Sequence, residues 1–414
     1  MAHAEHEAGG AGGVSRRAAL WGGVAVAAVS AAVLPGGTSQ AAEGAPQGGW
    51  IDVTAAPYGA KGDNATDDGT ALQAAFDACP EGGTVYLPPG IYKTKQTLHI
   101  RRRNITVRGA HAGRWPYATQ APSCVKPFYG SFTGAALIRI QDREETGLAY
   151  DIEGVRLVDL AFNGVFQPGP LDGLSASGLV RDLVLDRCSF WQFDGHAVRT
   201  ARYIRSDGSR AFPKGWRLNE VTAWATRGTY DGFRLEHLTD AQLTDCLAGE
   251  CHTGFYHVAP GDVTYASCRS VWNREHGYHL DTYSDGIIYN GCSTDRNGRD
   301  GWHLTARGAA NRPVLLSGCY ARRDGRTDTS AAGLRVLGAT DAPHPPVVVS
   351  GFVATTGVDD GGQGTLSPAY GLRVTASKPV VVAAGFLEGT SAGLFKDGSV
   401  VNADASVLTQ TARP

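Results

Sequence analysis

The chain has 414 residues, a formal net charge of −2 and 42% hydrophobic residues. A charge balance so close to neutral excludes a bulk electrostatic attraction to nucleic acid or to a membrane surface, so we expect neither partner. The 55 glycines are typical of a chain that turns often, because glycine adopts backbone conformations that other residues avoid. Together these features predict an all-β protein with many tight turns.

Residues 1–42 have the order of an export signal. Two arginines, Arg16 and Arg17, precede an apolar run at 20–34, and small residues follow at 38–42. This arrangement is typical of a twin-arginine-like signal peptide. The apolar run is too short and too rich in glycine for a stable membrane anchor. We therefore expect a secreted protein, with a linker at 43–49 before the folded part.

The folded part is expected to open with one helix. Leu72, Ala75, Phe76 and Cys79 follow the spacing i, i+3, i+4, i+7, which predicts a helix over about 69–79 with one apolar face. Asp67 or Asp68 can cap its first turn. Strand patterns follow as far as residue 109. Because the first layer of a stack of strands exposes its core, we expect this helix to act as an N-terminal cap.

The same opening stretch, 50–109, resembles the pectate-lyase-like superfamily of right-handed parallel β-helix proteins, closest to its rhamnogalacturonase-like and tailspike-like branch. The residues that carry the resemblance are Asp52-Val53, Tyr58-Gly59-Ala60-Lys61-Gly62-Asp63, Asp67-Asp68, Gly82-Gly83-Thr84-Val85-Tyr86 and Pro88-Pro89-Gly90 with Tyr92. The resemblance implies the fold, a single-stranded parallel β-helix. It implies no single activity, since the branch contains hydrolases, lyases, epimerases and adhesins.

A repeat in the centre of the chain predicts the same fold independently. Gly232, Gly254, Gly277 and Gly301 are spaced by 22, 23 and 24 residues, and each begins a strand pattern of alternating apolar and polar residues. Repeats of this length indicate a solenoid, here expected over 50–405 with a polar tail at 406–414. A cysteine in a second strand pattern recurs about half a period after these glycines. This pattern predicts a ladder of buried free thiols at Cys188, Cys246, Cys268, Cys292 and Cys319.

Two irregular insertions, 110–134 and 202–215, interrupt the coils. The first contains Trp115, and the second contains the basic residues Arg202, Arg205, Arg210 and Lys214. Long insertions on a solenoid tend to line its binding face. We therefore expect Trp115 to contact substrate.

Aligning the strands on their glycines predicts which side chains point outward. The alignment places His196 and Val198 in the inward columns beside Phe233 and Leu235, and it places Arg199 in the outward column of Glu236. The other expected outward residues are Arg234, Glu236, Tyr256, His279, Asp281 and His303. Three more polar residues, Asp231, His276 and Asp300, stand just before the anchoring glycines.

Rigid strands that carry carboxylates, histidines and aromatic rings suit an extended polysaccharide. Glu236 and Asp281 share a column two coils apart, hence about 9.5 Å apart, which fits the carboxylate separation of about 6.5–9.5 Å in inverting glycosidases. We expect glycoside hydrolysis by this pair, assisted by His279 and His303. The expected substrate-binding residues are Arg234, Tyr256, Asp231, His276, Asp300, Arg199 and Trp115.

Two other functions fit the same face. A polysaccharide lyase would neutralise a uronate with Arg234 or Arg199 and use His279, His303 or Tyr256 as the base. A non-catalytic glycan-binding or adhesive β-helix would need only the aromatic and polar surface. The resemblance does not extend to the Asn-Thr-Asp, Gly-His-Gly and Arg-Ile-Lys motifs of polygalacturonase-like enzymes, which are missing from the central coils. No cofactor or metal motif is found, and no oligomeric state is predicted.

Overall fold

The computed structural model describes residues 49–113, 123–281, 285–306, 313–338, 346–375, 380–399 and 401–412. All of them belong to one unit, Pro46–Pro414. The expected signal peptide (1–42), most of the linker and Trp115 lie outside the described residues. Within the described ranges, no helix is long and apolar enough to cross a membrane.

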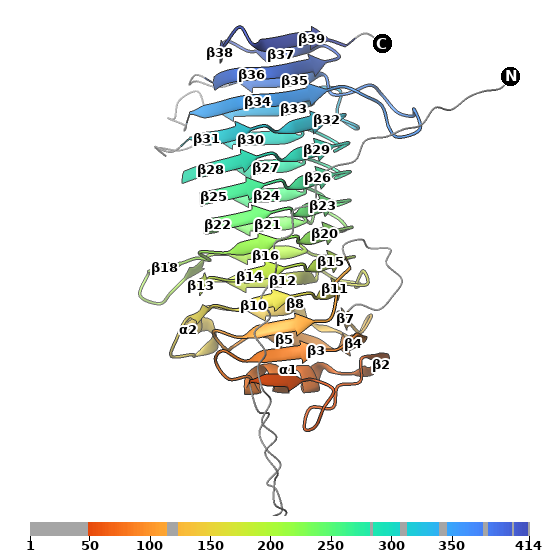
Figure 1. Ribbon diagram of the computed structural model, residues 1–414, viewed down its shortest axis with the longest axis vertical. Helices are drawn as coiled ribbons and strands as arrows, with labels where there is room; N and C mark the ends of the chain where they lie inside the picture. Colours follow the sequence, from red (N-terminus) through yellow and green to blue (C-terminus); the bar gives the residue numbers. More distant parts are fainter. Residues whose placement is uncertain are drawn as a thin grey trace, which may run out of the picture. The chain divides into compact units, whose positions relative to one another are not determined.

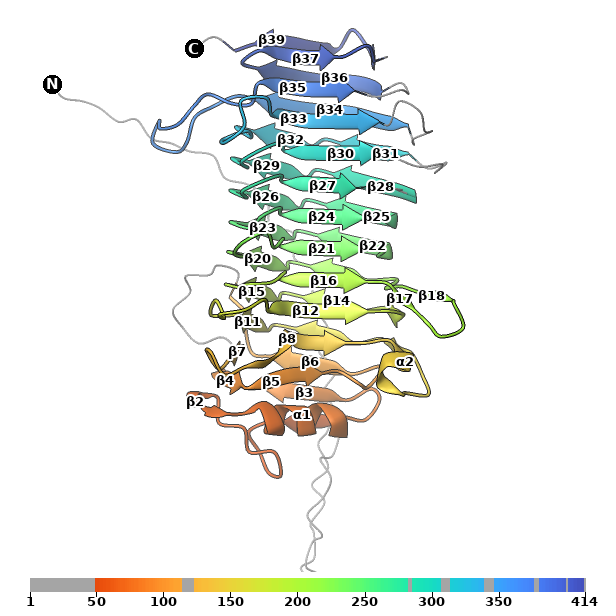
Figure 2. The same ribbon diagram turned by 180° about the vertical axis from the view of Figure 1, so that it is seen from behind.

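Eleven strands stack into one parallel sheet (Figure 2). In chain order they are β5 (Gln96–His99), β8 (Thr133–Ile140), β12 (Asp172–Ser177), β16 (Val198–Ala201), β21 (Phe233–Glu236), β24 (Phe255–Val258), β27 (Tyr278–Asp281), β30 (Trp302–Ala306), β33 (Ala332–Gly338), β35 (Tyr370–Thr375) and β37 (Ala392–Lys396). Each strand pairs with the strand one coil away, so neighbouring rungs are about 4.8 Å apart. This eleven-stranded sheet presents the face that the sequence predicted as functional.

Two further rows of parallel strands complete the coils (Figure 1). The first row is β1 (Trp50–Asp52), β3 (Thr84–Leu87), β6 (Thr106–Gly109), β10 (Arg156–Val158), β14 (Val184–Asp186), β19 (Arg217–Asn219), β22 (Thr239–Thr244), β25 (Gly261–Ala266), β28 (Asp285–Asn290), β31 (Val314–Ser317), β34 (Val347–Thr355), β36 (Val380–Gly389) and β38 (Val401–Ala403). The second row is β2 (Asp63–Asp67), β4 (Gly90–Thr94), β7 (Ser123–Pro127), β11 (Ala161–Asn163), β15 (Ser189–Trp191), β20 (Thr222–Trp224), β23 (Leu247–Gly249), β26 (Arg269–Val271), β29 (Ser293–Asp295) and β32 (Tyr320–Arg322), continued by β34, β36 and β39 (Val407–Thr411). The predicted right-handed parallel β-helix is therefore confirmed.

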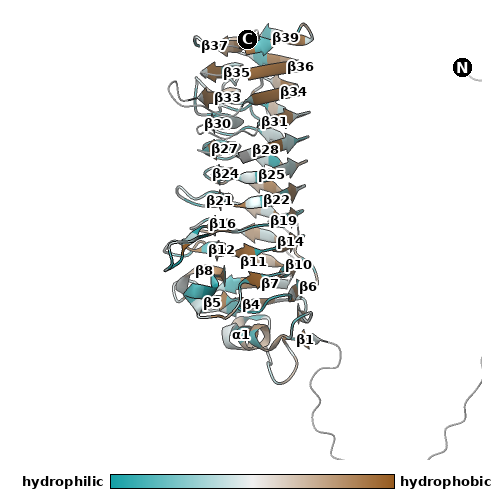
Figure 3. Ribbon diagram, turned by 90° about the vertical axis from the view of Figure 1, so that its left-hand side faces the viewer, coloured by the Kyte–Doolittle hydropathy of each residue, from teal (hydrophilic) through white to brown (hydrophobic). Residues whose placement is uncertain are grey.

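Inward side chains from successive rungs stack on one another. Phe233 and Phe255 have ring centroids 4.6 Å apart, and the stack continues through Tyr278 to Trp302 with two spacings of 5.0 Å. Strands β34 and β36, in the C-terminal coils, are largely hydrophobic (Figure 3). Offset or parallel aromatic stacking adds to the free energy of burying these large rings. The inward stack fixes the register of the outward side chains.

The predicted thiol ladder is confirmed. All eight cysteines of the chain are free and buried. The Cys246 thiol donates to the Leu218 carbonyl oxygen at 3.5 Å, and the Cys268 thiol donates to the Leu243 carbonyl oxygen at 3.3 Å. Each thiol thus contacts the preceding coil, as expected of a small buried side chain with a weak donor.

Helix α1 (Gly69–Ala78) lies beside β5 at one end of the stack (Figures 1 and 2). Leu72, Ala75 and Phe76 are buried in the core of the solenoid. Asp68 occupies the N-cap position without a side-chain capping bond, while the neighbouring Asp67 carboxylate accepts from the Gly69 N–H at 3.1 Å. Helix α1 and its buried face are as predicted, and the role of α1 as a cap stays a prediction.

Replacing Leu72 with alanine tests that role. Leu72 is fully buried, and removing such a side chain is expected to lower the free energy of unfolding by about 2–5 kcal/mol, because a cavity remains. Thr70 on the same helix is exposed, so Thr70→Ala is expected to change it by less than about 0.5 kcal/mol. Denaturant unfolding of both variants measures the difference. Equal, small effects would show that α1 does not protect the core.

Two expectations about the chain were wrong. Residues 407–411, expected in a polar tail, form β39 and pair with β36, because the ladder bonds of β36 are open to another strand. The alignment of β16 was displaced by two residues: Val198 pairs with Phe233, and Arg199 pairs with Arg234 rather than with Glu236. A shift of two keeps every side chain on its face, so alternation alone does not reveal it.

Candidate functional site

One outward column of the eleven-stranded sheet runs from β5 to β37, and we call it the outward ladder. Its members, paired rung by rung, are His99, Arg139, Ser175, Arg199, Arg234, Tyr256, His279, His303, Arg335, Arg373 and Phe395. Five of these are arginines on both sides of a Tyr-His-His centre. Carboxylates beside the column pair with four of these arginines, Arg139, Arg199, Arg234 and Arg335.

The centre of the outward ladder is a row of touching side chains. The Arg234 guanidinium lies over the Tyr256 ring at 3.9 Å from its centroid. The rings of Tyr256 and His279 are 4.4 Å apart and nearly perpendicular, and those of His279 and His303 are 4.7 Å apart. The structure thus brings together the four residues that the sequence predicted in this column. A guanidinium, a phenol and two imidazoles follow one another on consecutive rungs.

The two predicted carboxylates lie beside this row. Glu236 pairs with Val258 and Val258 pairs with Asp281, so the carboxylates are two rungs apart in one column, as expected. Both have partners: Arg234 Nε donates to Glu236 Oε1 at 2.8 Å, and Tyr256 Oη donates to Asp281 Oδ2 at 2.8 Å. Each carboxylate therefore orients one member of the outward ladder.

A third set of polar residues occupies the starts of the same strands. These residues, each two positions before the first inward side chain, are Asp172, His196, Asp231, Thr253, His276 and Asp300. Several bond the next coil: the Asp172 carboxylate accepts from the His196 N–H, and the Asp231 N–H donates to His196 Nδ1 at 3.0 Å. We call this set the strand-start column. It links the rungs beneath the outward ladder.

Sequence reasoning identified Asp231, His276 and Asp300 but missed Asp172 and His196. The missed pair lies next to a predicted residue, since Arg199 Nη1 is 3.7 Å from Asp172 Oδ2. The signal that could have found it is the sequence Val198-x-Thr200, which fills the two inward positions of β16. Placing Val198 there moves His196 to the strand start.

Asp300 organises the end of the site. His303 Nδ1 lies 2.8 Å from Asp300 Oδ2, His276 Nδ1 lies 3.5 Å from the same oxygen, and Arg335 Nε lies 3.1 Å from Asp300 Oδ1. Among the residues that the structure describes, His276, Asp300 and His303 offer ligating atoms that lie within 4.8 Å of one another and could hold a metal ion. The Arg335 guanidinium balances the negative charge of Asp300. The cluster of His276, Asp300 and His303 is therefore electrostatically balanced by residues of this chain.

Burial sets the protonation states of this row. Desolvation, followed by the charge of His303, lowers the pKa of His279 to about 4. Desolvation and the hydrogen bond to Asp281 raise the pKa of Tyr256. Desolvation also raises the pKa of Asp172 to about 6. At neutral pH, His279 is therefore an uncharged proton acceptor beside a protonated phenol.

Buried histidines predict a loss of stability in mild acid. Desolvation lowers the pKa of His196 and of His279 to about 4 and that of His257 to about 3, against 6.5 in the unfolded chain. Below pH 6.5 the unfolded state binds more protons than the folded state. The contribution of these histidines to the free energy of unfolding is therefore fully present above pH 6.5 and decreases towards pH 4, by about 1.4 kcal/mol per pH unit for each histidine. Denaturant unfolding between pH 7 and 5 measures this slope.

His257→Leu is the matched variant for that slope. His257 points inward between Leu235 and Leu280, and its Nδ1 lies 3.1 Å from Tyr265 Oη. It is thus a buried core histidine. The variant is expected to reduce the slope of the free energy of unfolding against pH by the contribution of one histidine, about 1.4 kcal/mol per pH unit. An unchanged slope would show that His257 does not contribute.

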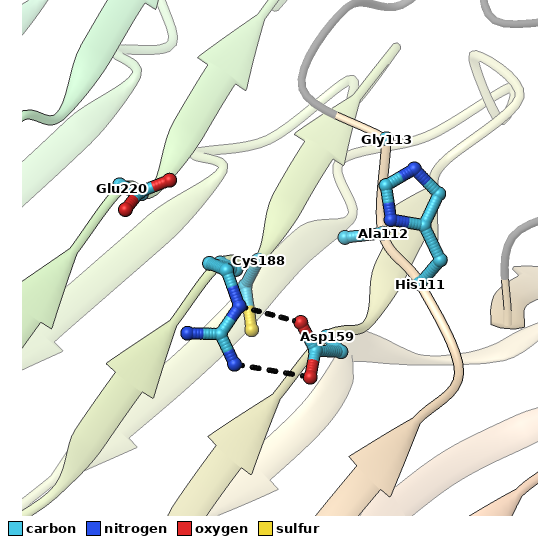
Figure 4. Close-up of a pocket in the computed structure, with 7 residues that line it drawn as sticks. His111, Ala112, Gly113, Asp159, Cys188 and Glu220 are labelled. Carbon is cyan, nitrogen blue, oxygen red and sulfur yellow. Dashed lines mark hydrogen bonds and ion pairs between the residues drawn. The ribbon is translucent and has the colours of Figure 1, made fainter. Parts of the chain in front are cut away.

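A separate small cavity lies away from the eleven-stranded sheet (Figure 4). Its volume is about 90 Å³, and Asp159, Cys188 and Glu220 are among its lining residues. Arg187 donates to both Asp159 oxygens, at 2.7 and 3.1 Å. Ligand pockets are usually larger, about 300–1,000 Å³, and the Arg187–Asp159 ion pair is part of the lining of this cavity.

Comparisons of the sequence match short parts of the chain. Residues 50–134 match the family model described as rhamnogalacturonase A/epimerase, pectate lyase-like. Rhamnogalacturonase A of Aspergillus niger is 60% identical over 35 residues, which cover 8% of this chain and 8% of that protein. Alginate lyase 7 of Azotobacter vinelandii is 60% identical over 64 residues, which cover 14% of this chain and 8% of the lyase. The matches thus cover a small part of each relative's length.

Solved structures resemble the chain over most of its length. The A-module of mannuronan C-5 epimerase AlgE6 from Azotobacter vinelandii has a TM-score of 0.62 at 18% identity, covering 88% of this chain and 99% of the module. Tailspike protein 2 of an Escherichia coli O157:H7 bacteriophage has a TM-score of 0.59 at 13% identity, covering 82% of this chain and 44% of the tailspike. Likeness at these identities shows the fold alone. Residues 50–134 thus match the pectate lyase-like family model, and the observed coils of the described residues share the parallel β-helix fold of these structures.

Proposed function

We propose that the protein is an exported enzyme that removes the proton beside the carboxylate of a uronate residue in a polysaccharide. The observation that carries the proposal is the outward ladder, in which Arg234, Tyr256 and His279 touch on consecutive rungs. The names of the curated relatives, rhamnogalacturonase and alginate lyase, support a polysaccharide as the substrate. Export rests on the sequence of residues 1–42.

Arginines spaced by one rung suit a chain of negatively charged sugars. Arg199 and Arg234 occupy neighbouring rungs, and each has more N–H donors than its present partners use. A guanidinium binds a carboxylate through two parallel hydrogen bonds. In the proposed complex, Arg234 holds the carboxylate of the reacting sugar and Arg199 holds that of its neighbour.

Acid and base stand on the two rungs after Arg234. The uncharged His279 imidazole takes the proton from C5, and Arg234 stabilises the charge that develops on the carboxylate. In elimination, Tyr256 then donates a proton to O4 as the C4–O4 bond breaks and the C4=C5 bond forms. In epimerisation, a proton returns to C5 from the opposite face and no bond of the chain breaks. A bound carboxylate beside His279 would raise its pKa towards neutrality.

Glycoside hydrolysis is the second candidate, because Glu236 and Asp281 keep the predicted two-rung separation. That separation, about 9.5 Å, lies at the upper edge of the inverting range. A hydrolase needs one carboxyl group that presents a proton to the leaving oxygen. The Glu236 carboxylate instead accepts a hydrogen bond from the Arg234 guanidinium, with Nε and Oε1 2.8 Å apart. This contact favours proton abstraction over hydrolysis.

A panel of neutral and uronate-containing polysaccharides tests the proposal. The chain from residue 43 onwards is incubated with each, while new reducing ends and the ultraviolet absorbance of a C=C bond are followed together. Absorbance that rises in step with reducing ends is expected for elimination. Reducing ends without absorbance would establish hydrolysis, and Glu236→Gln would then abolish turnover. With proton abstraction, Glu236→Gln is expected to reduce turnover only through the orientation of Arg234.

A further inference from the structure

A second basic site lies beside the outward ladder. It is a pocket of about 480 Å³ lined by Arg202, Arg210, Phe212, His237, Thr239 and Pro260, together with Ala259 and Gly261. Its volume falls within the range of ligand pockets, about 300–1,000 Å³. No residue in this lining is acidic. Nothing in the proposed reaction uses these side chains.

The place of the pocket follows from the strands. Arg202, His237 and Ala259 come directly after the last residues of β16, β21 and β24, which are three neighbouring rungs. Arg234 and Tyr256 lie two residues before the ends of β21 and β24. Three residues along a strand span about 10 Å. The pocket is thus displaced sideways from the outward ladder, across the direction in which a polysaccharide would follow the rungs.

The two pocket arginines differ from their neighbour on the same hairpin. Arg205, between β17 (Tyr203–Ile204) and β18 (Arg210–Ala211), donates to Asp142 through Nε and Nη2, both at 3.0 Å, and to Asp151 at 2.7 Å. Arg205 therefore fixes the hairpin. Among the described residues, the side chains of Arg202 and Arg210 have neither an ion pair nor a hydrogen bond, although the backbone of Arg210 pairs with β17.

Two guanidinium groups that face one pocket repel each other unless an anion lies between them. Burial lowers the pKa of the neighbouring His237, and the charge of Arg202 lowers it further. His237 is therefore an uncharged hydrogen-bonding partner, while Phe212 and Pro260 supply apolar walls. This combination suits an oxyanion attached to a sugar ring.

We propose that this pocket binds an anionic group, a sulfate ester or a carboxylate, that projects sideways from the polysaccharide bound on the outward ladder. The identity of the polysaccharide rests on the proposed function, but binding of the anion does not. The pocket would select a substituted or branched substrate, because a linear unsubstituted chain leaves it empty. A sulfate and a carboxylate share the bidentate recognition by arginine.

Titration with the two anions separately tests the inference. Sodium sulfate and sodium glucuronate are titrated into the wild-type chain, Arg202→Ala/Arg210→Ala and Arg217→Ala at constant ionic strength, by isothermal titration calorimetry. Arg217 is an exposed arginine of β19 outside the pocket. The double variant is expected to bind the preferred anion at least about tenfold more weakly, and Arg217→Ala is expected to bind as the wild type does. The preferred anion identifies the substituent.

Equal binding by the double variant and the wild type, or no binding by the wild type, would overturn the inference. Thermal unfolding of each variant verifies that the fold is retained, which is expected because both arginines are exposed. Turnover of polysaccharide is not measured in this experiment. If the double variant lost anion binding and the wild-type chain turned over no polysaccharide of the panel, the anion site would be supported and the proposed reaction would be rejected.

Discussion

His279→Ala is expected to lower kcat by about 10²–10⁴-fold, the usual contribution of a positioned general base. The His279 ring lies between Tyr256 and His303 on the outward ladder, and its pKa of about 4 keeps it uncharged and able to accept a proton. The side chain points away from the apolar core, so the fold should persist. Initial rates on the best polysaccharide of the panel measure the effect.

His111→Ala is the control for this variant. His111 is exposed and lines the small cavity beside Asp159 rather than the outward ladder. Its kcat is expected to stay within about twofold of the wild-type value, as for surface substitutions away from a site. Retention of wild-type kcat by His279→Ala, with the fold intact, would remove His279 from the reaction and direct attention to His303, which Asp300 orients.

Arg234→Ala is expected to lower kcat/KM by about 10²-fold or more. Two charge-assisted hydrogen bonds to a substrate carboxylate are lost, each worth about 1.5–3 kcal/mol. The variant also removes the cation over the Tyr256 ring and the partner of Glu236. Steady-state kinetics with the uronate polysaccharide measure the change.

Arg234→Lys separates charge from geometry. Lysine keeps the positive charge but lacks the planar fork, so an intermediate loss is expected. Arg156, an exposed arginine of β10, provides the matched control, and Arg156→Ala should be neutral. If Arg234→Ala lowered activity on neutral polysaccharides as much as on uronates, the guanidinium would not act by binding a carboxylate.

Much of the fold could be predicted from the sequence because the coils repeat. From Gly232 onwards, the glycine spacing and the alternation of side chains placed Arg234, Tyr256, His279 and His303 correctly in one outward column. The stacked aromatic core enforces this register, since a slip of one residue would bury the polar face. Patterns that the core enforces are the ones that sequence reasoning recovers.

The parts that sequence reasoning missed depend on turns and on side-chain contacts. His196 was misplaced because a shift of two residues at β16 preserves the inward and outward alternation. The pairing of Glu236 with Arg234, and of Asp281 with Tyr256, follows from side-chain rotamers that no periodicity encodes. These contacts changed the preferred reaction from hydrolysis to proton abstraction.

The fate of the C5 proton tests the central claim most directly. Each uronate polysaccharide of the panel is treated with the enzyme in D₂O, and the product is examined by proton NMR. The proposal predicts loss of the C5–H signal, either with a new C4=C5 alkene signal or with deuterium at C5 of an inverted sugar. Cleavage that leaves every C5–H intact would contradict it and would assign the reaction to Glu236 and Asp281 as a hydrolytic pair.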